Sequence, residues 1–326
     1  MAGRNGGMTM DQIAAELGIS KTTVSRALSG KGRVSTETRA RVLELAHGAG
    51  AAPRLRTHNL SLVIPEHFMR LDLPFLRKCM GGVTKMAAQR GYDLLLCYVS
   101  ESDTEQLERQ LANRKMDGVI LSRTIDNDPC VTLLQRYGVP FVAIGRLNDI
   151  QAPQIDNDQL GASAEITRLL LQVGMRRIAF FSGNLNYTVN ADRLHGYLRG
   201  FTEVGLSADH ALIYTGIETD AQRTDALENL LEQSPECLLC CDDAMAFWAL
   251  QALRQRGISV PEQLRLASLY DSELLFDATP PISAVQFDAE RLGNTAARLL
   301  LDQIAGKPTP QRQVQGYQVI LRESTK

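Results

Sequence analysis

The stretch GISKTTVSRALSG, residues 18–30, decides the fold of the first part of the chain. Val24, Ala27 and Leu28 recur at the spacing of one helix face, which predicts that they point into a core. The opposite face carries cationic and hydroxyl side chains: Lys21, Thr22, Ser25, Arg26 and Ser29. An ordinary solvated helix shows the same pattern, so the neighbouring sequence has to decide between a solvated face and a binding face.

A second helix is predicted just before this one. Thr9 and Gln12 form a capping box at the start of MDQIAAEL, and Gly18 ends that helix. Ser20 caps the helix of the opening stretch, and Ser35 caps a third helix over TETRARVLELAH. The expected core of the three helices is Ile13, Ala14, Leu17, Ile19, Val24, Leu28, Val34, Val42 and Leu45. Two helices joined by a tight glycine turn, the second with a polar outer face, predict a helix-turn-helix that fits a DNA major groove.

The net charge of −2 hides a basic head. Residues 1–58 hold nine Lys and Arg against four Asp and Glu, whereas the remainder holds 26 against 33. This asymmetry indicates that only the first part of the chain meets a polyanion. Together with the helix-turn-helix pattern, it favours double-stranded DNA as a partner.

The composition predicts a soluble globular protein. With 326 residues, 44% of them hydrophobic, the chain can form two or three domains. Its apolar runs are far shorter than a membrane span and no signal-peptide pattern opens it, so we expect a cytoplasmic protein with no membrane partner. Among six cysteines, the cluster CLLCC at 237–241 fits a buried strand better than a metal or redox site, because no second ligand pair accompanies it.

From Leu60 onward, short apolar runs alternate with helix-length segments, which predicts parallel sheets covered by helices on both faces. The expected strands are 60–64, 93–99, 118–121, 141–144, 177–181, 211–214, 237–241, 264–269 and 283–287. These units are too many for one small domain, and QIDNDQLGAS at 154–163 is predicted to join two lobes. Because ligands bind at the carboxyl ends of strands in such sheets, two facing lobes imply a cleft.

Head and body together resemble the lactose-repressor (LacI/GalR) family of bacterial transcription regulators. In the head, the resemblance covers MTMDQIAAELGISKTTVSRALSGKGRVSTETRARVLELA nearly residue for residue. In the body, MDGVILSRT, IDNDQLGASAEITRLLLQVGMRRIAFFSG, CCDDAMAFWALQALRQRGISVPEQLRLASLYD and the closing ILREST follow in the family's order. The resemblance implies an all-α helix-turn-helix head joined to an α/β body with two lobes and parallel sheets, like a periplasmic binding protein.

The resemblance also implies which head residues meet DNA. Lys21, Thr22 and Arg26 take base-reading positions, and Arg33 in the following loop matches another DNA-contacting position. Arg26 can bind guanine O6 and N7 with both arms of its guanidinium. The phosphate-binding positions, which fix register rather than sequence, are Thr9, Ser20, Thr23 and Ser25.

In the body, the resemblance implies lobes that are each discontinuous in sequence. The effector-binding positions are Arg193, Asp243 and Asp271, with Phe75, Ser100, Arg146 and Phe287 as walls of the cleft. Such a set suits a sugar, because carboxylates accept hydroxyl protons, a guanidinium donates to oxygens and an aromatic ring covers an apolar sugar face. Without the family register, Asp271 and Arg193 would be interpreted as surface ion-pair partners.

Three arginines leave the charge of the effector open. Arg123, Arg146 and Arg193 all follow or flank predicted strand ends. If two or more of them face the cleft, a sugar phosphate or sugar acid is favoured. In the alternative interpretation, Arg123 and Arg146 point to solvent or to the nearby Asp126 and Asp149.

The linker departs from the family pattern. Relatives place a hinge before the first strand, and on DNA it becomes a short helix that inserts a leucine into the minor groove. Here APRLRTHNLSLVIPE reaches the strand much sooner, and Leu60 falls both at the inserting position and at the start of the strand. We expect Leu60 to stay in the strand, with Arg54 and Arg56 making minor-groove or phosphate contacts.

Taken together, the sequence predicts a repressor that binds a palindromic operator as a homodimer and responds to a sugar, sugar acid or sugar phosphate. The expected domains are a helix-turn-helix at 1–52, a linker at 53–59 and an effector-binding and dimerisation domain at 60–326. The last divides into an N-lobe at about 60–154 and 284–313 and a C-lobe at about 155–283 and 314–326.

Two other functions would use the same body, namely those of an α/β enzyme and a solute-binding receptor. The chain shows no G-x-G-x-x-G after a strand, no Walker A loop, no G-x-S-x-G elbow and no H-E-x-x-H pair. We therefore expect no catalytic residues, no cofactor and no metal. The basic head and the lack of an export signal oppose a receptor.

Overall fold

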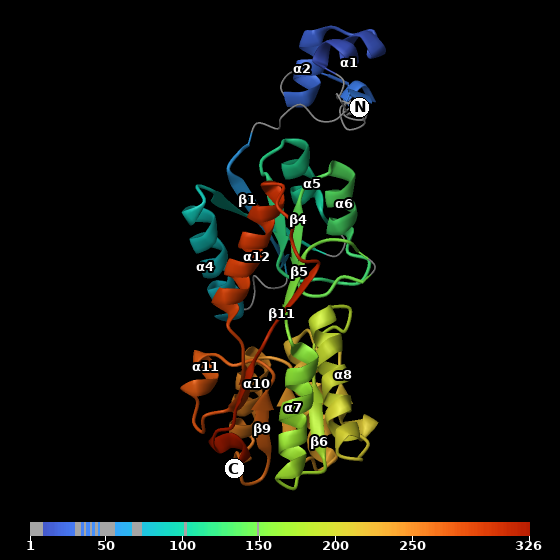
Figure 1. Cartoon of the computed structure of the whole chain (residues 1–326). Coiled ribbons are helices and arrows are strands. Elements are labelled where there is room, and N and C mark those ends of the chain that lie inside the picture. The colour runs from blue at the N-terminus through green and yellow to red at the C-terminus, as the bar shows by residue number, and fades with distance from the viewer. Residues whose placement is uncertain are drawn as a thin grey trace.

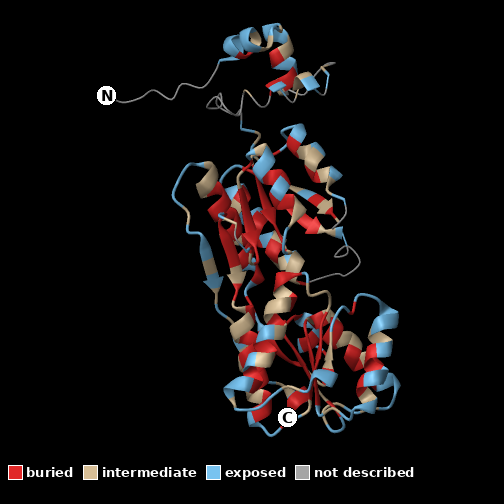
Figure 2. Cartoon of the chain, turned by 90° about the vertical axis from the view of Figure 1, so that its right-hand side faces the viewer, coloured by how far each residue is buried: buried red, intermediate tan, exposed pale blue. Residues whose placement is uncertain are grey.

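The structure, a computed structural model, describes residues 9–29, 34–35, 37–39, 41–42, 45, 56–66, 74–100, 103–148 and 150–326. A helical head precedes a body of two lobes, each built on a six-stranded sheet (Figure 1). The central strands of both sheets are buried, and the outer faces of the covering helices are exposed (Figure 2). The predicted fold class is confirmed.

Local chemistry fixes both ends of α1 (Met10–Leu17) in the head. Thr9 Oγ1 accepts from the Gln12 amide at 3.3 Å and Gln12 Oε1 accepts from the Thr9 amide at 2.6 Å, which completes the expected capping box. Gly18 ends the helix at a φ of 63°, a left-handed conformation that glycine adopts without strain. Next comes α2 (Lys21–Ser29), where Ser20 Oγ accepts from the Thr23 amide at 3.1 Å.

The head has the small core that the sequence predicts. Helical conformation follows at 37–39, 41–42 and 45, the described part of the expected third helix, and Ser35 Oγ accepts from the Thr38 amide at 3.1 Å. The buried residues are Ile13, Val24, Ala27 and Val42, with Ala14, Leu17, Ile19, Leu28, Val34 and Leu45 packed against them. Gly30 and Gly32, which we expect in the loop between the second and third helices, lie outside the described residues.

The N-lobe sheet has the strand order β11-β5-β4-β3-β1-β2, and all of its pairs are parallel. Its strands are β1 (Asn59–Pro65), β2 (Asp93–Val99), β3 (Gly118–Leu121), β4 (Phe141–Ile144), β5 (Gln154–Asn157) and β11 (Arg312–Gln315). Every residue of β3 and β4 is buried, as expected for strands covered on both faces.

Two pairs of helices cover this sheet. One face packs on α4 (Pro74–Gln89) and α12 (Ala289–Ile304), and the other on α5 (Glu105–Ala112) and α6 (Pro129–Tyr137). The helices α4 and α12 approach closely through glycines. A Cβ atom at Gly82 would lie 1.9 Å from the carbonyl oxygen of Glu290, and one at Gly293 would lie 2.0 Å from that of Cys79. Only a residue without a side chain fits at these two positions.

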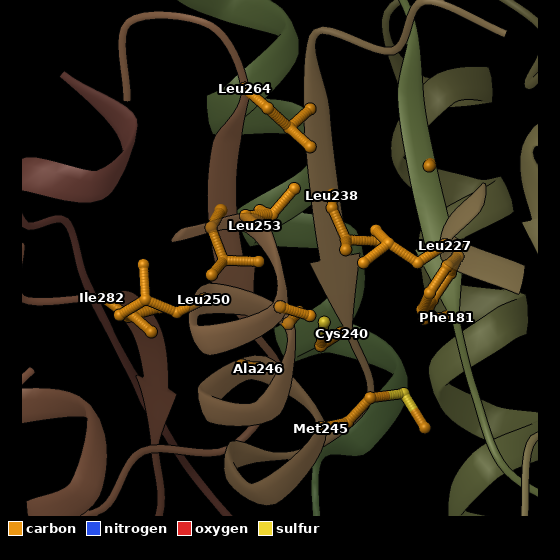
Figure 3. Close-up of a cluster of buried hydrophobic side chains, with 14 of the residues drawn as sticks. Phe181, Leu227, Leu238, Cys240, Met245, Ala246, Leu250, Leu253, Leu264 and Ile282 are labelled. Carbon is orange, nitrogen blue, oxygen red and sulfur yellow. The ribbon is translucent and has the colours of Figure 1, made fainter. Parts of the chain in front are cut away.

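The C-lobe sheet has the order β12-β10-β9-β8-β6-β7, parallel except for β12 against β10. Its strands are β6 (Ile178–Phe181), β7 (Ile213–Tyr214), β8 (Cys237–Cys240), β9 (Arg265–Ser268), β10 (Ser283–Gln286) and β12 (Gln318–Ile320). One face packs on α7 (Gln159–Gln172) and α8 (Thr188–Glu203). The other packs on α9 (Asp220–Glu232), α10 (Asp243–Gln255) and α11 (Glu273–Phe276), and Figure 3 shows that apolar cluster.

The chain crosses between the lobes three times. It passes from β5 to α7, from β10 to α12 and from β11 to β12, so each lobe contains separate segments of sequence. The predicted joining segment at 154–163 contains the first crossing. All three crossings lie a few residues later than the predicted lobe boundaries, because β5, β10 and β11 complete their pairing before the chain leaves each sheet.

Some strand predictions were wrong or incomplete. Residues 154–157 form β5, and the polar edge strand β11 and the short β12 were not expected. In the predicted strand 211–214, only Ile213 and Tyr214 are extended, because Asp209 accepts from the Ala211 amide and starts a 3-10 helix at His210–Leu212. A second 3-10 helix, Glu323–Thr325, closes the chain.

The cysteine cluster lies in a buried strand. Cys237 and Cys240 belong to β8, Cys241 follows it, and all six cysteines are buried and unpaired. Within the described ranges, no three His, Cys, Asp or Glu residues gather as a metal site. No helix in the same ranges is long and apolar enough to cross a membrane.

Candidate functional site

The outer face of α2 is exposed as the sequence predicts. Lys21, Thr22, Ser25 and Arg26 are exposed, while Val24 and Ala27 are buried on the opposite side. Thr23 is half-buried, and its hydroxyl lies 2.8 Å from that of Ser20 at the start of the helix. Cationic and hydroxyl groups on one exposed face provide donors for phosphates and for guanine edges.

Lys21 has a partner within the head. Its Nζ lies 2.9 Å from a carboxylate oxygen of Asp11 on α1, and both side chains are more than half exposed. Exposed pairs of this kind contribute only about 0–1 kcal/mol. DNA can therefore displace Asp11 from Lys21 at little cost, so the ion pair does not oppose the predicted base contact.

The segment before β1 is held by the body. The amides of Thr57 and His58 donate to the Asp117 carboxylate at 2.8 and 3.0 Å, and Arg56 donates to the carbonyl of Ile304 at 3.4 Å. Leu60 is fully buried in β1 between β2 and β3, which confirms that it belongs to the first strand. Arg33 and Arg54 lie outside the described residues.

A cleft lies between the lobes, where the carboxyl ends of strands from both sheets meet. It has an inner compartment of about 60 Å³ and an outer one of about 920 Å³, and Arg123 and Asp242 line both. The side chains facing the inner compartment come from both lobes and include Phe75, Thr124, Asp156, Asn157, Arg193, Asp243 and Tyr270. The outer one is lined by Glu66, Ser100, Asp128, Tyr187, Glu218 and Arg223, among others.

Arg193 is fixed inside the inner compartment. It projects from α8, is 5% exposed, and donates from Nε to Gln159 Oε1 at 2.9 Å and from Nη1 to the Cys241 carbonyl at 2.6 Å. Without the family resemblance, Arg193 would be interpreted as a surface ion-pair partner. That interpretation is wrong, because the side chain is buried and its two acceptors are neutral. Neither acceptor therefore forms an ion pair with the guanidinium.

Carboxylates from both lobes balance this charge. Burial and the charge of Asp242 raise the pKa of Asp243 to about 6, and burial raises that of Asp156 to about 6. Asp242 caps α10 by accepting from the Met245 amide at 2.8 Å. Asp243 and Asn157 line the inner compartment, and Oδ1 of Asn157 is buried without a hydrogen-bond partner.

Arg123 lies at the boundary between the compartments. Its guanidinium lies 5.4 Å from the ring centre of Tyr187, a cation–π contact between the lobes. Burial and the nearby charge of Arg193 lower its pKa to about 10, so it stays protonated at neutral pH. Arg123 lines both compartments and therefore faces the cleft, while Asp149, one of its two alternative partners, lies outside the described residues.

The cleft includes two of the four predicted wall residues. Phe75, at the start of α4, lies on the inner compartment with its ring 5.7 Å from Tyr270 in an edge-to-face contact. Ser100 lies on the outer compartment. Sequence reasoning missed several inner residues: Thr124, Asp156, Asn157, Gln159, Thr188 and Tyr270. The rule that ligands meet strand ends would have found most of them, since Thr124 follows β3 and Asn157 ends β5.

Three predicted residues line neither compartment. Asp271 forms a buried ion pair with Arg322, with both contacts at 2.7 Å, so its two oxygens are occupied within the C-lobe. Phe287 packs in the C-lobe core, stacked 6.4 Å from Tyr270. Arg146 pairs with Asp192 at 3.1 Å and keeps 25% of its side chain exposed. These residues support the walls rather than form them.

Two groups of contacts join the lobes beside the cleft. In one group, the hydroxyls of Thr124 and Thr188 lie 2.7 Å apart. Beside them, the backbones of Ile125 and Tyr187 pair in an isolated β-bridge, and Arg146 forms an ion pair with Asp192. In the other group, Lys78 of α4 pairs with Glu273 of α11 at 2.8 Å. A ligand in the cleft therefore touches both lobes at once and alters their relative stability in this arrangement.

The thiols of the outer compartment are not activated as nucleophiles. Neither compartment has a histidine or lysine among the described residues that line it. Cys241, a thiol on the outer wall, has its pKa raised to about 12 by burial, and Cys130 there is raised further, also by burial. A thiol held protonated is a poor nucleophile, and the neighbouring carboxylates of Asp242 and Asp128 raise these pKa values further.

Comparisons with known proteins agree with this geometry. Residues 9–50 match the family described as bacterial regulatory proteins, lacI family, and residues 167–325 match a periplasmic binding protein-like domain. The HTH-type transcriptional regulator CelR of Thermobifida fusca is 31% identical over 97% of this chain and 98% of its own. The HTH-type transcriptional regulator AglR of Rhizobium meliloti is 30% identical over 98% and 94%.

Solved structures show the same architecture. A complex of the transcriptional regulator CelR with cellobiose superposes with a TM-score of 0.77 at 31% identity, covering 97% of this chain and 99% of that one. A lac repressor dimer bound to operator superposes with a TM-score of 0.71 over 98% and 99% of the two chains. At 19% identity, this second likeness shows a shared fold.

Proposed function

The chain belongs to the lacI family of bacterial regulatory proteins, and from this premise we propose that it represses transcription as a cytoplasmic homodimer whose operator binding responds to a sugar. The family membership makes it a DNA-binding transcriptional regulator, in agreement with its exposed α2 face. Its relatives are regulators rather than enzymes or receptors.

One observation carries the proposed sugar response. Arg193 and Asp243 of the C-lobe line the same compartment as Phe75 and Asn157 of the N-lobe. Such a set of a guanidinium, a carboxylate, an amide and an aromatic ring is suited to a polyhydroxylated ring. The cellobiose complex of the relative CelR supports the same ligand class.

We propose the following division of labour among residues. On DNA, Lys21, Thr22 and Arg26 read bases. Thr9, Ser20, Thr23 and Ser25 bind phosphates, with further contacts from Arg33, Arg54 and Arg56. In the cleft, Phe75, Ser100, Arg193 and Asp243 contact the effector together with Arg123 and Asn157, which the structure adds. Arg146, Asp271 and Phe287 are proposed as supporting residues, because their partners lie within the protein.

The proposed domains follow the predicted division. Residues 1–52 bind DNA, 53–59 connect, and 60–326 bind the effector and dimerise. A two-fold dimer presents two α2 helices, which explains why an inverted repeat is the expected operator. The lac repressor dimer on its operator, which shares the fold, supports this arrangement.

The test is selection of operator sequences from random DNA by the full-length protein. We expect an inverted repeat, with binding that weakens steeply as salt rises, because lysines and arginines displace counterions from phosphates. Equal affinity for the selected sequence and for a scrambled one at moderate salt would contradict the proposal. Native mass determination of the complex tests the dimer, since a single protomer per operator would exclude it.

A further inference from the structure

The inner compartment contains acceptors that a neutral ligand can satisfy. Asp243 and Asn157 both line it, the two residues are 2% and 4% exposed, and Oδ1 of Asn157 is buried without a hydrogen-bond partner. A buried polar atom without a partner is costly, so a ligand that supplies the missing group is favoured. A carboxylate and an amide oxygen both accept from a hydroxyl group.

The cationic groups of the compartment are already balanced. Arg123 and Arg193 face it together with three carboxylates, those of Asp156, Asp242 and Asp243. Two donor atoms of Arg193 are occupied by Gln159 and by the carbonyl of Cys241. A carboxylate or phosphate on the ligand would add a negative charge to a site whose acids already outnumber its arginines.

The helix N-terminus beside the compartment is occupied by the protein's own acids. Asp242 caps α10 and Asp243 is its first residue, so the amides that bind anions at such ends face carboxylates. Acidic side chains also outnumber basic ones in the outer compartment. It is lined by Glu66, Asp128, Glu218 and Asp220, whereas Arg223 is paired with Asp220 at 2.8 Å.

The sizes of the compartments add a second constraint. A cavity needs about 10–15 Å³ of space to hold one water molecule. The inner compartment has about 60 Å³, which is enough for one hydroxyl-bearing edge of a sugar ring but too little for a whole ring. The outer compartment, about 920 Å³, is at the upper end of the roughly 300–1,000 Å³ typical of ligand sites. Arg123 and Asp242 line both compartments, so the two lie next to each other in the cleft.

Resting on the proposed function, we infer that the effector is a neutral oligosaccharide of at least two rings. One hydroxyl-bearing edge of its terminal ring enters the inner compartment and donates to Asp243 and Asn157, against the face of Phe75. The remaining ring or rings occupy the outer compartment. Sugar acids and sugar phosphates are excluded, although two of the three arginines considered from the sequence do face the cleft.

The test measures melting temperature and calorimetric affinity of the full-length protein with matched ligands. The neutral disaccharides are cellobiose, maltose and lactose. Each is compared with its aldonic acid, which carries one carboxylate, and with glucose and glucose 6-phosphate. We expect at least one neutral disaccharide to raise the melting temperature, because ligands of the folded state stabilise it. Its aldonic acid and the two monosaccharides should bind at least tenfold more weakly.

Two variants identify the atoms responsible. Asp243→Asn replaces one acceptor with a donor, so affinity for the neutral disaccharide should fall about tenfold or more while the aldonic acid binds closer to its neutral partner. Asp288→Asn makes the same change at the exposed cap of α12 and should alter neither. Arg193 is left intact in both variants.

The outcomes separate this inference from the proposed function. Binding of glucose 6-phosphate or an aldonic acid at least as tight as that of the neutral sugar would overturn the inference and leave a sugar-responsive regulator. Equal binding of glucose and a disaccharide would overturn the requirement for two rings. If no sugar in the panel changes the melting temperature, both the sugar response and the inference are contradicted.

Discussion

The head and the body of this regulator place their functional groups in opposite environments. The α2 face of the head exposes Lys21, Thr22 and Arg26 to solvent, whereas Arg193 and Asp243 of the cleft are at least 95% buried. An exposed face needs only a small apolar core beneath it, but buried charged groups need two complete lobes to hold them. The groups on the α2 face are therefore close together in sequence, whereas the groups in the cleft come from distant segments and need the whole body to position them.

This comparison predicts that body variants change stability and head variants change DNA affinity. The largest effect is expected for Gly82→Ala in α4. Its Cβ would lie 1.9 Å from a backbone carbonyl of α12, so the helices must move apart, at a cost of roughly 3 kcal/mol or more in the free energy of unfolding. Gly81→Ala has no atom within 4 Å of its Cβ and should be neutral or stabilising. Chemical denaturation of both variants checks this, and equal stability would contradict the close packing.

Leu60→Ala is expected to have the next largest effect. The side chain is fully buried in β1, so its loss should lower the free energy of unfolding by about 2–5 kcal/mol. Operator affinity of the folded variant should stay within about twofold of the parent. In a circular-permutation gel, the operator should bend little at its centre with either protein, because no leucine is inserted. A sharp central bend that disappears in folded Leu60→Ala would show that Leu60 leaves the strand on DNA.

Asp243→Asn is expected to change how the free energy of unfolding depends on pH. The pKa of Asp243 is raised to about 6 in the folded protein from about 3.9 in the unfolded chain, so the folded state retains its proton between these values. This carboxylate therefore lowers stability as pH rises from about 4 to 6, by about 3 kcal/mol in total. Relative to the parent, the variant should gain that amount between pH 4 and pH 8 in denaturation curves. If the free energies of unfolding of variant and parent differ by a constant amount from pH 4 to pH 8, the raised pKa of Asp243 is contradicted.

Arg26→Ala in the head should have the smallest energetic effect and the most selective one. Loss of one guanidinium contact to a base should cost about 1–3 kcal/mol of operator affinity and relax base choice at one position per half-site. Melting temperature and sugar affinity should not change. Arg199→Ala removes an exposed arginine on α8 and serves as the control, which should bind operator like the parent. An equal loss of operator affinity in Arg26→Ala and Arg199→Ala would indicate a general effect of net charge rather than a contact from Arg26 to a base.

The same comparison explains what the sequence alone could predict. The core and polar face of the head depend on residues a few positions apart, so helical spacing was enough to place Val24 and Lys21 on opposite sides. Strands of the body core, such as β3 and β4, were predicted to the residue because buried parallel strands are continuous apolar runs. The edge strand β11 was missed because its sequence, RQVQ, is mostly polar.

The cleft was predictable only in part. Arg193 and Asp243 came from the family resemblance, and the structure places both in one compartment. Asp271 was assigned to the effector because nothing local reveals its partner Arg322, which lies 51 positions away. Asn157 was missed because its segment was interpreted only as a join between lobes, although the crossing itself brings that residue to the cavity.

The measurement that tests the account most directly is the affinity for the selected operator with and without the neutral disaccharide that stabilises the protein most. If the buried cleft controls the exposed head, saturating sugar should change operator affinity by about 5- to 150-fold, and operator should change sugar affinity by the same factor. Arg193→Ala should bind operator as the parent does and show no change with sugar. Sugar that binds the parent tightly yet leaves its operator affinity unchanged would contradict the account.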